Sequence, residues 1–565
     1  MLEPSDVSDL VEQHDLYFEG RRDELRELRR LYMTRFWQNE SENALDGILR
    51  TEVPKAYAVV ESYLGSLYAK NPAVRVEPDL RDRGNPEVAE ATANQYLLTI
   101  REQLEDATRL ALIYPCAFLK LAPEESVDPL KRVSCAALPP WEVIVDATAC
   151  SWDQQRHVGH VYLMPLDEAA VRFSKPEEAF KPRAYSKWIE QAGTANTRMR
   201  NIEANAGAVP SKEQWVRVVE LYDLREDRLL VWSADYDDGQ SFLFEGVTVQ
   251  VGALDPDADA SAEAPEAELE HERTGIPFKS ASGRPVVPIL PLYFSRDPDT
   301  PMRGYSLLAR SLDQFREMNV MRTYQAQGVR RMARQWMVKA GFLSEDAAAK
   351  IAQGMDGEFV EVDLAPGLPL EGNILPVPQA PIPGDITLYA ATVDGDIRDA
   401  GLLAPFTRGE VTKSTATEQN LLAAYTSSEI GRMARIRDAV ITGVARTYNV
   451  MLSVVLGDDA EPLALPNPVG PTILSADDLT GDFGYWAVDA GTTPMSDLSK
   501  QQSLERLAPI LVQLGADPAL ILEEMVRVFQ LPENLATPAP PPPAPEAVAE
   551  AEGAPLPPAA LPPGV

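Results

Sequence analysis

Two segments of the chain carry residue types that bind metal ions, and both patterns are incomplete. The segment DPDADASAEAPE, residues 255–266, has Asp at positions 1, 3 and 5 and Glu at position 12 of a calcium-loop pattern. Position 6 is Ala260, where the sharp turn of such a loop needs glycine, and Pro265 interrupts the loop. We therefore interpret the segment as part of a solvated acidic insertion, residues 255–272.

The second segment contains Cys150, His157 and His160, which are residue types that bind zinc. The two histidines form the pattern HVGH within a strand-like run, and residues three apart on a strand point to opposite faces. The sequence therefore favours ordinary strand residues over a metal site. A metal-dependent hydrolase would need convergent carboxylates and histidines, so it remains the least favoured alternative.

Motifs for phosphate binding and nucleophilic catalysis do not occur in the sequence. There is no GxxxxGK[ST] pattern, and the KST at residues 413–415 lacks the preceding glycines that would cradle a phosphate. There is no GxSxG pattern, and no histidine has a Cys or Ser nearby in a triad-like arrangement. The sequence predicts a protein that is not an enzyme and that uses no cofactor or metal.

One segment reverses the sign of charge of the whole chain. Residues 303–340 contain only two acids, Asp313 and Glu317. Their cations are Arg303, Arg310, Arg316, Arg322, Arg330, Arg331, Arg334 and Lys339. One interpretation pairs these cations with acidic groups of neighbouring copies of the chain, a second places some of them against DNA, and a third leaves them solvated.

Composition limits the class of protein. At 565 residues the chain is too long for one compact core, so several domains or an elongated subunit are expected. It has 52 Lys and Arg against 86 Asp and Glu, a formal charge of −34, which argues against a protein that grips nucleic acid over its whole surface.

The three cysteines form no CxxC motif and fit a reducing cytoplasm. The acidic N-terminus predicts no signal peptide, and polar residues interrupt the apolar windows 107–122 and 439–456, so no membrane span is expected.

The periodicity predicts helices at the N-terminus and strands after them. Residues 1–70 read as helical, with Leu25, Leu28 and Leu31 on one apolar face and a second helix at residues 56–69. A strand follows at VRVEP, then a helix over residues 86–113. Residues 114–250 are rich in β-branched, alternating runs, interrupted by one short helix, DEAAVRF.

The central block consists of three predicted helices separated by irregular segments. A long helix covers residues 303–340, and a Pro/Gly-rich excursion with one strand-like run at 358–362 follows. A second helix covers residues 386–403, and a third begins near residue 416 after a polar loop. One or two strands lie within residues 474–490, two helices cover 496–530, and the low-complexity sequence from residue 537 is predicted to be disordered.

This order resembles the tailed-bacteriophage portal proteins, a family of head-to-tail connectors. The resemblance extends from about residue 16 to residue 532. Residues 61–78, ESYLGSLYAKNPAVRVEP, resemble the portal N-terminal helix that ends at Asn-Pro and enters a strand, and residues 139–173 resemble the wing. RGYSLLARSLDQFREMN resembles the start of the first stem helix, and STATEQNLLAAYTSSEIGRMARIRDAV the helix after the tunnel loop. FGYWAVDAGTTPMSDLSKQQSLERLAPIL resembles the last wing strand that leads into the crown.

The resemblance implies an α+β fold, with an elongated subunit that assembles as a ring. Its parts are N-terminal helices and an α/β wing (1–300), a first stem helix (301–340), a clip (341–384), a second stem helix (385–403), a tunnel loop (404–417), a long kinked helix with the last wing strands (418–492), a helical crown (493–535) and a disordered Pro/Ala-rich tail (536–565). The acidic insertion at 255–272 and the tail match no part of the family's pattern.

The same resemblance implies a structural role in the virion. A ring of twelve copies at one capsid vertex would form the channel for packaging and ejection of double-stranded DNA, without sequence specificity. Its implied partners are the major capsid protein and scaffold, the terminase large subunit and the head–tail adaptor, with assembly in the host cytoplasm and no membrane. Twelve copies would carry a charge of about −400, which lets DNA slide without sticking.

The resemblance also suggests which cations meet DNA. The tunnel loop would present Arg408 and Lys413 to the channel, and the stem helix a cationic face of Arg310, Arg316, Arg322, Arg330, Arg331 and Arg334. Arg408 and Lys413 could equally pair with Glu410 or Glu418. The main alternative function is another virion structural protein, such as a head–tail adaptor or an internal core protein.

Overall fold

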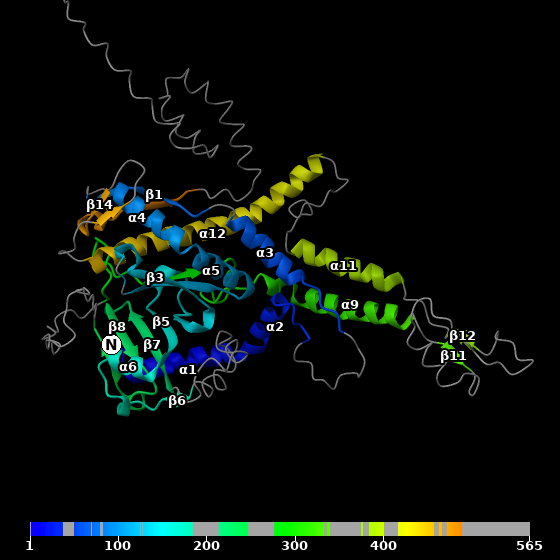
Figure 1. The fold of residues 1–565 in the computed structure, drawn as a ribbon, viewed down its shortest axis with the longest axis horizontal. Helices are drawn as coiled ribbons and strands as arrows, with labels where there is room; N and C mark the ends of the chain where they lie inside the picture. The colour runs from blue at the N-terminus through cyan, green and yellow to red at the C-terminus, as the bar shows by residue number, and fades with distance from the viewer. Residues whose placement is uncertain are drawn as a thin grey trace, which may run out of the picture. The chain divides into compact units, whose positions relative to one another are not determined.

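The computed structural model divides the chain into two compact units, Met1–Thr492 and Thr493–Val565, and every residue described below belongs to the first. The described residues are 2–37, 50–68, 71–78, 83–124, 126, 128–184, 214–246, 276–332, 336–338, 374–376, 384–400, 416–456, 463–465 and 472–488. Helices and strands are both abundant in this part of the chain, which is the α+β class that the sequence predicts (Figure 1).

The N-terminal helices follow the predicted apolar face but are shorter than predicted. Helix α1 is Pro4–Gly20, α2 is Arg22–Tyr32 and α3 is Lys55–Leu67. The chain leaves the helical conformation at Arg21, next to Gly20, because glycine is a poor helix former. Leu25, Leu28 and Leu31 are buried, as their helical spacing predicts.

The predicted helix over residues 86–113 is two helices. Helix α4 is Pro86–Thr99 and α5 is Arg101–Ile113, and the helix breaks at Ile100. Asn85 begins α4 with a side-chain cap, since its Oδ1 accepts the N–H of Glu87 at 3.1 Å. Before α4, strand β1 (Val74–Glu77) pairs antiparallel with β15 (Gly484–Ala487), so two segments far apart in the sequence are joined in one ladder.

A six-stranded antiparallel sheet forms the wing-like part of the chain, and its strands match the β-branched runs of the sequence. The order is β4-β5-β7-β8-β9. Strand β6 pairs with Gln214 and Trp215 at the start of β7, and β8 pairs with the second half of β7. The bounds are β4 Val143–Val145, β5 His157–Pro165, β6 Arg183–Ala184, β7 Gln214–Asp223, β8 Arg228–Trp232 and β9 Phe242–Glu245.

Helices cover both faces of this sheet. Val7 and Val11 of α1 pack with Val219 and Leu221 of β7, whereas Ala169 of α6 (Leu166–Arg172) packs with the even-numbered valines of β7. Successive side chains of a strand point to opposite faces, so α1 and α6 lie on opposite sides of the sheet. The segment of α6 is the DEAAVRF run, and its helical prediction is confirmed.

A second sheet connects the wing-like part to the long helix. Its three antiparallel strands are ordered β10-β2-β3, with bounds Ile289–Leu292, Ala117–Pro123 and Val133–Leu138. Helix α12, Ala416–Leu456, contacts β2 and β10 as well as α3 and α4. Among the described residues one helical stretch, Glu429–Leu456, is long and apolar enough to cross a membrane. More than half of its most apolar window is buried in this chain, so we interpret it as a core helix.

The helix that the sequence predicts over residues 303–340 begins later and ends earlier in the structure. A 3-10 turn, η6 (Leu308–Ser311), leads into α9 (Leu312–Met332). Gly304 has a left-handed φ of 69°, which prevents a helix from starting at residue 303. Ser306 Oγ accepts the N–H of Leu308 at 3.1 Å and so marks the actual start. The predicted end at residue 340 is also wrong, because strand β11 (Trp336–Val338) lies there.

The remaining elements follow in sequence. Strand β11 pairs with β12 (Ile374–Pro376), and α11 is Gly384–Ala400. Helix α12 includes residues 416 and 417, which the sequence analysis placed in the tunnel loop. Strand β13 (Leu463–Leu465) pairs with β14 (Thr472–Leu474). Short 3-10 helices are η1 Pro129–Lys131, η2 Pro140–Glu142, η3 Trp152–Gln154, η4 Glu177–Ala179, η5 Asp237–Gly239 and η8 Asp477–Leu479.

Several predicted features lie outside the described residues. They are the calcium-like loop at 255–266 and its acidic insertion, the strand-like run at 358–362, the tunnel loop up to residue 415, the helices at 496–530 and the proline-rich tail. Of the clip, only residues 374–376 and 384 are described.

Candidate functional site

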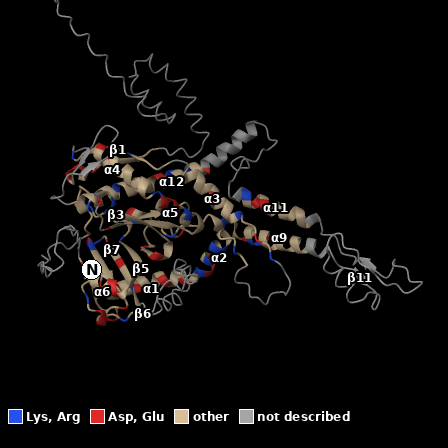
Figure 2. Cartoon of the chain, viewed as in Figure 1, with Lys and Arg blue, Asp and Glu red and all other residues tan. Residues whose placement is uncertain are grey.

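The candidate site is the packed helix pair α9–α11, which carries the cations that the sequence analysis selected. Figure 2 shows charges of both signs on these helices. Arg310, Arg316 and Arg322 have described side chains. Arg330 and Arg331 lie in the last turn of α9, where only the backbone is described, and Arg334, Arg408 and Lys413 lie outside the described residues.

Arg310 connects the start of the stem helix to α12. Its guanidinium lies 3.7 Å from Glu429 Oε1, and the same carboxylate accepts a 2.8 Å hydrogen bond from Arg432 of α12. Arg432 also donates to the carbonyl oxygen of Phe294 at 2.6 Å. The hydrogen bond from Arg432, with the charge of Arg310, holds the pKa of the Glu429 carboxyl below its usual value. Arg310 is therefore committed to a contact within the chain.

Arg316 makes a second internal ion pair, between α9 and α2. Its Nε and Nη2 each donate to Glu27 at 2.5 Å, and its Nη1 donates to Asp313 at 2.8 Å. This is the two-point geometry in which a planar guanidinium binds a carboxylate most strongly. The hydrogen bonds to Glu27 raise the pKa of the Arg316 guanidinium.

Arg322 differs from these two residues. It is exposed, and its described contact is a 3.4 Å hydrogen bond to Gln325 on the same helix. Of the three arginines with described side chains, two thus serve internal packing of the chain. Arg322 has the position that a contact with another molecule requires.

Helices α9 and α11 run antiparallel and share one apolar seam. Phe315 and Met318 of α9 and Val393 and Ile397 of α11 are buried in the same hydrophobic cluster. The C-terminal half of α11 contacts η6 at the start of α9, and the two helices lie side by side (Figure 1). Burial of this seam is the main free-energy gain that holds the pair together.

Polar anchors attach the pair to the N-terminal helices. The buried Asn319 accepts the N–H of Val53 at 2.8 Å, and Thr323 accepts the N–H of Thr51 at 3.0 Å. Lys55 of α3 lies 2.5 Å from Asp394 of α11. Burial raises the pKa of the Asp394 carboxyl, but the charges of Lys55 and Arg398 outweigh this and lower it. These contacts fix the direction in which the pair leaves the core.

The outer surface of the same pair carries large apolar side chains. Tyr324 of α9 is 61% exposed, and Leu388 and Tyr389 of α11 are 69% and 43% exposed. An apolar helix face in contact with water favours coverage by another protein surface. Tyr324 is one of the apolar residues spread around the whole predicted helix 303–340, so periodicity does not single it out as exposed, and Leu388 and Tyr389 lie on the other helix, α11.

The two histidines that suggested zinc are used in different ways. His160 Nδ1 lies 3.1 Å from Lys120 Nζ, which itself donates to Glu220 at 2.6 Å. A cation at this distance from Nδ1 is incompatible with a metal ligand there. His157 lies on the opposite face of β5, as the spacing predicts, and burial lowers its pKa. Within the described residues, no group of three or more His, Cys, Asp or Glu side chains could hold a metal ion.

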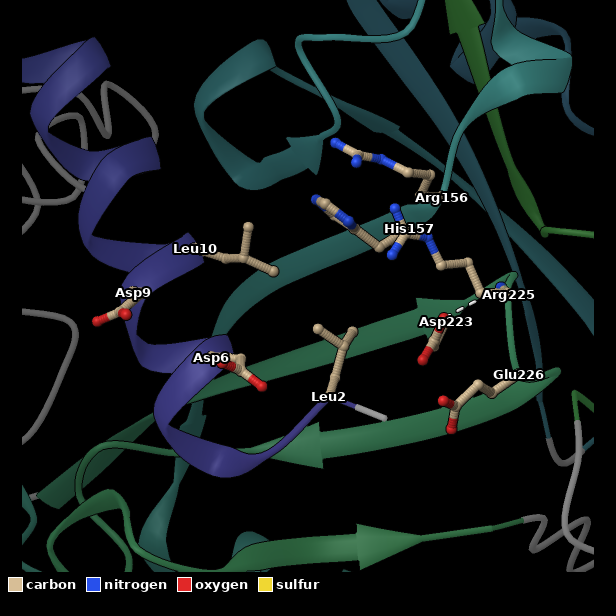
Figure 3. Close-up of a pocket in the computed structure, with 9 residues that line it drawn as sticks. All are labelled: Leu2, Asp6, Asp9, Leu10, Arg156, His157, Asp223, Arg225 and Glu226. Atoms are coloured by element: carbon tan, nitrogen blue, oxygen red, sulfur yellow. Dashed lines mark hydrogen bonds between the residues drawn. The ribbon is translucent and has the colours of Figure 1, made fainter.

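One hollow lies between α1 and the ends of β5 and β7, with a volume of about 410 Å³. Figure 3 shows Asp6 and Leu10 of α1 pointing toward the strands that carry His157 and Asp223, whereas the Asp9 side chain points away from them. Two of its charged groups already have partners: Asp223 accepts the N–H of Arg225 at 3.0 Å, and Arg156, at the rim, is bound to Asp146. The arrangement of an acid, a base and a nucleophile that catalysis requires is not assembled among these residues.

Comparison with known proteins adds little to this description. No family model matches the chain, and no curated protein matches it. Among solved structures, the chain is similar to one from the virion of a native gene transfer agent (GTA) particle. That similarity has a TM-score of 0.40 and 12% sequence identity, and it covers 88% of this chain and 95% of the other. It is too low to establish a shared fold.

Proposed function

We propose that this chain is a portal-type virion structural protein, whose copies form a ring around a channel for double-stranded DNA. The observation that carries the proposal is the α9–α11 pair: two antiparallel helices, separated in sequence by the Pro/Gly-rich excursion and followed by the 41-residue α12. This is the helix, clip, helix, loop and long-helix order that the sequence resemblance implies.

The surface of the helix pair supports assembly from identical copies. Its inner seam and polar anchors are satisfied within the chain, while Tyr324, Leu388 and Tyr389 face outward. Contact of one copy's pair with the next copy's would cover these side chains. Such a head-to-tail contact closes into a ring when each step rotates by a constant fraction of a circle.

Charge supports a conduit rather than a clamp for DNA. The formal charge of −34 per chain repels phosphate, and Arg310 and Arg316 are neutralised by Glu429 and Glu27. Weak contacts from sparse cations such as Arg322, and the proposed tunnel-loop residues Arg408 and Lys413, would steady DNA without stopping it. Docking of the motor and the adaptor at the clip is part of the same proposal.

Electron microscopy of the purified full-length chain tests the proposal. Negatively stained particles should be rings with a central hole, and mass photometry should give one dominant species of about twelve subunits. A monomer at micromolar concentration in low salt would contradict it. A metal-dependent hydrolase would instead degrade DNA in the presence of magnesium or manganese.

A further inference from the structure

Three arginines gather around two tyrosines at the base of the stem helix. The guanidinium carbon of Arg303 lies 3.7 Å from the ring centroid of Tyr17, and that of Arg21 lies 5.0 Å from the same ring. Arg296 lies 5.8 Å from the ring of Tyr293. In the part of the chain that the structure describes, none of these three guanidinium groups has an ion pair or a side-chain hydrogen bond.

The backbone holds Arg303 rigidly at the centre of this group. Gly304 has a left-handed φ of 69°, and a Cβ there would lie 2.1 Å from the carbonyl oxygen of Pro115. The N–H of Arg303 donates to Thr300 at 2.9 Å, and Tyr293 donates to the carbonyl oxygen of Met302 at 2.9 Å. The backbone of residue 303 is therefore fixed within the chain, and the Tyr17 ring holds one face of its guanidinium.

The buried position of the Arg303 guanidinium makes its positive charge energetically unfavourable. Arg303 is partly buried, and its Nε is enclosed without a hydrogen-bond partner among the described residues. Burial lowers the pKa of Arg303, which means that the site disfavours the charge it contains. The acid nearest in sequence, Asp297, already accepts the N–H groups of Asp299 and Thr300. An external anion would repay this cost.

The position contrasts with other arginines of the same region. Arg217 donates two hydrogen bonds to the carboxylate of Asp15 on α1, and Arg316 donates two to the carboxylate of Glu27. A chain with 86 acids and 52 cations has carboxylates in excess. Three neighbouring arginines without an ion pair to any described carboxylate are unusual in such a chain, although Asp297 lies close enough to Arg21 to feel its charge. They mark a surface that another molecule completes.

We propose that this cluster, Arg21, Arg296 and Arg303 with Tyr17 and Tyr293, binds an Asp or Glu side chain of a second copy of the chain. A tyrosine ring covers the face of the Arg303 guanidinium, so a carboxylate can approach its edge in the two-point geometry. Arg and Tyr are enriched at protein interfaces, and the acidity of every copy supplies the complementary charge. Two large apolar side chains beside the cluster are exposed and could be covered by the same contact. Leu16, which precedes Tyr17, is 59% exposed, and Tyr305, which follows Gly304, is 42% exposed. The inference rests on the proposed ring, since a head-to-tail contact brings two unlike surfaces together.

Cross-linking of the variant Arg303→Lys tests the partner. A carbodiimide joins a lysine amine to a carboxylate that touches it. Assembly from equal amounts of ¹⁴N- and ¹⁵N-labelled chains identifies links between different copies by mass spectrometry. We expect residue 303 to be linked to an Asp or Glu of another copy. Assembled material without such a link, or with links only inside one copy, would overturn the proposal.

Removal of the charge gives a second readout. Arg303→Met should raise the concentration for half-assembly at least tenfold and make assembly less sensitive to salt. Lys175→Met is the matched control, because Lys175 also lies over a tyrosine, 5.6 Å from the ring of Tyr236, and is not part of the cluster. Equal effects of the two variants would contradict a specific site. Circular dichroism checks that both variants fold.

A third arm separates this inference from the proposed function and from DNA binding. Rings that form equally well with Arg303→Met would overturn the carboxylate site but leave the portal proposal intact. Association of the Arg303→Lys variant into something other than a ring, with the cross-link present, would support the carboxylate site but overturn the portal proposal. If the variant assembles normally but loses affinity for a fluorescent 30-base-pair duplex, the anion is a phosphate and the proposal is wrong.

Discussion

The wing-like sheet and the α9–α11 helix pair use their side chains in opposite ways. Between the two sheets, Lys120 of β2 donates to Glu220 of β7 at 2.6 Å, Tyr222 donates to the other oxygen of that carboxylate, and all three side chains are largely enclosed. On the helix pair the polar anchors lie at its base, and large apolar side chains such as Leu388 face water. One region is complete within a single chain, and the surface of the other is not.

This difference indicates where stability and assembly reside. Removal of one partner of a buried ion pair destabilises the folded chain strongly, because the remaining charge is buried away from water and has no opposite charge beside it. An exposed apolar side chain contributes little to folding of the isolated chain but gains free energy when a second surface covers it. Substitutions in the two regions should therefore separate the folding of the chain from its association.

The largest effect is expected from Lys120→Met. This change leaves the carboxylate of Glu220 buried without its cation, so the free energy of unfolding should fall by about 3–5 kcal/mol. Urea denaturation followed by circular dichroism measures it. The double variant Lys120→Met, Glu220→Gln removes both charges and should recover a large part of the loss. A single variant as stable as the wild type would show that the sheet does not depend on this pair.

A smaller effect concerns pH and His14. Burial lowers the pKa of this imidazole to about 4. Its Nε2–H donates to the carbonyl oxygen of Trp141 at 3.0 Å, and Nδ1 has no hydrogen-bond partner in the described part of the chain. The unfolded chain takes up the proton near pH 6.5, and the folded chain does not until about pH 4. The free energy of unfolding should therefore fall as the pH decreases from 6.5 to 4, by up to about 3 kcal/mol.

The variant His14→Gln, which does not titrate, isolates this contribution. We expect the stability difference between wild type and variant to shrink as the pH falls from 7 to 4. Parallel stability curves for the two proteins over this range would argue against a neutral, buried His14.

The next effect tests the anchored base of the helix pair. Asn319→Ala removes the acceptor for the N–H of Val53 and should cost about 1–3 kcal/mol, because a buried donor is left without a partner. Hydrogen exchange at the Val53 amide should accelerate in parallel. Thr392→Ala is a suitable comparison, since the Thr392 hydroxyl is exposed and bonds only to Leu388 of its own helix in the described structure. Protection of Val53 that survives the change would refute the anchor.

The smallest effect on folding is expected from Leu388→Ser. Its side chain is 69% exposed, so the free energy of unfolding of the dissociated chain should change by less than about 0.5 kcal/mol. Association measured by sedimentation velocity should nevertheless weaken. Val393→Ser on the same helix should show the reverse balance, because Val393 is 4% exposed and packs in the seam. If Leu388→Ser leaves association unchanged, this face is not an interface.

Local elements were the most predictable part of the molecule. The spacing of Leu25, Leu28 and Leu31 predicts the buried face of α2, and the alternating runs predict β5, β7 and β8. Helix ends were less predictable. The breaks at Arg21 and Ile100 and the late start of α9 depend on backbone conformation and capping, of which Gly304 and Ser306 give only a local hint.

The candidate site was only partly predictable. The sequence identified the cation-rich stem segment, but not which cations are already neutralised, because Glu27 and Glu429 lie far from Arg316 and Arg310 along the chain. It suggested that the histidines of HVGH face opposite ways, and it did not indicate that Lys120 meets His160. The DNA-contact roles of Arg408 and Lys413 stay predictions, since these residues lie outside the described part of the chain.

The sequence by itself determined the α+β class, the acidic balance of the chain and the order of its helices, because these follow from composition and from periodicity over a few residues. Only the tertiary structure decided which charges are paired. It brings β1 next to β15, Val53 next to Asn319, and Arg303 to a place that no described carboxylate reaches. Such contacts join residues hundreds of positions apart, and their energies depend on distance and burial in the folded chain.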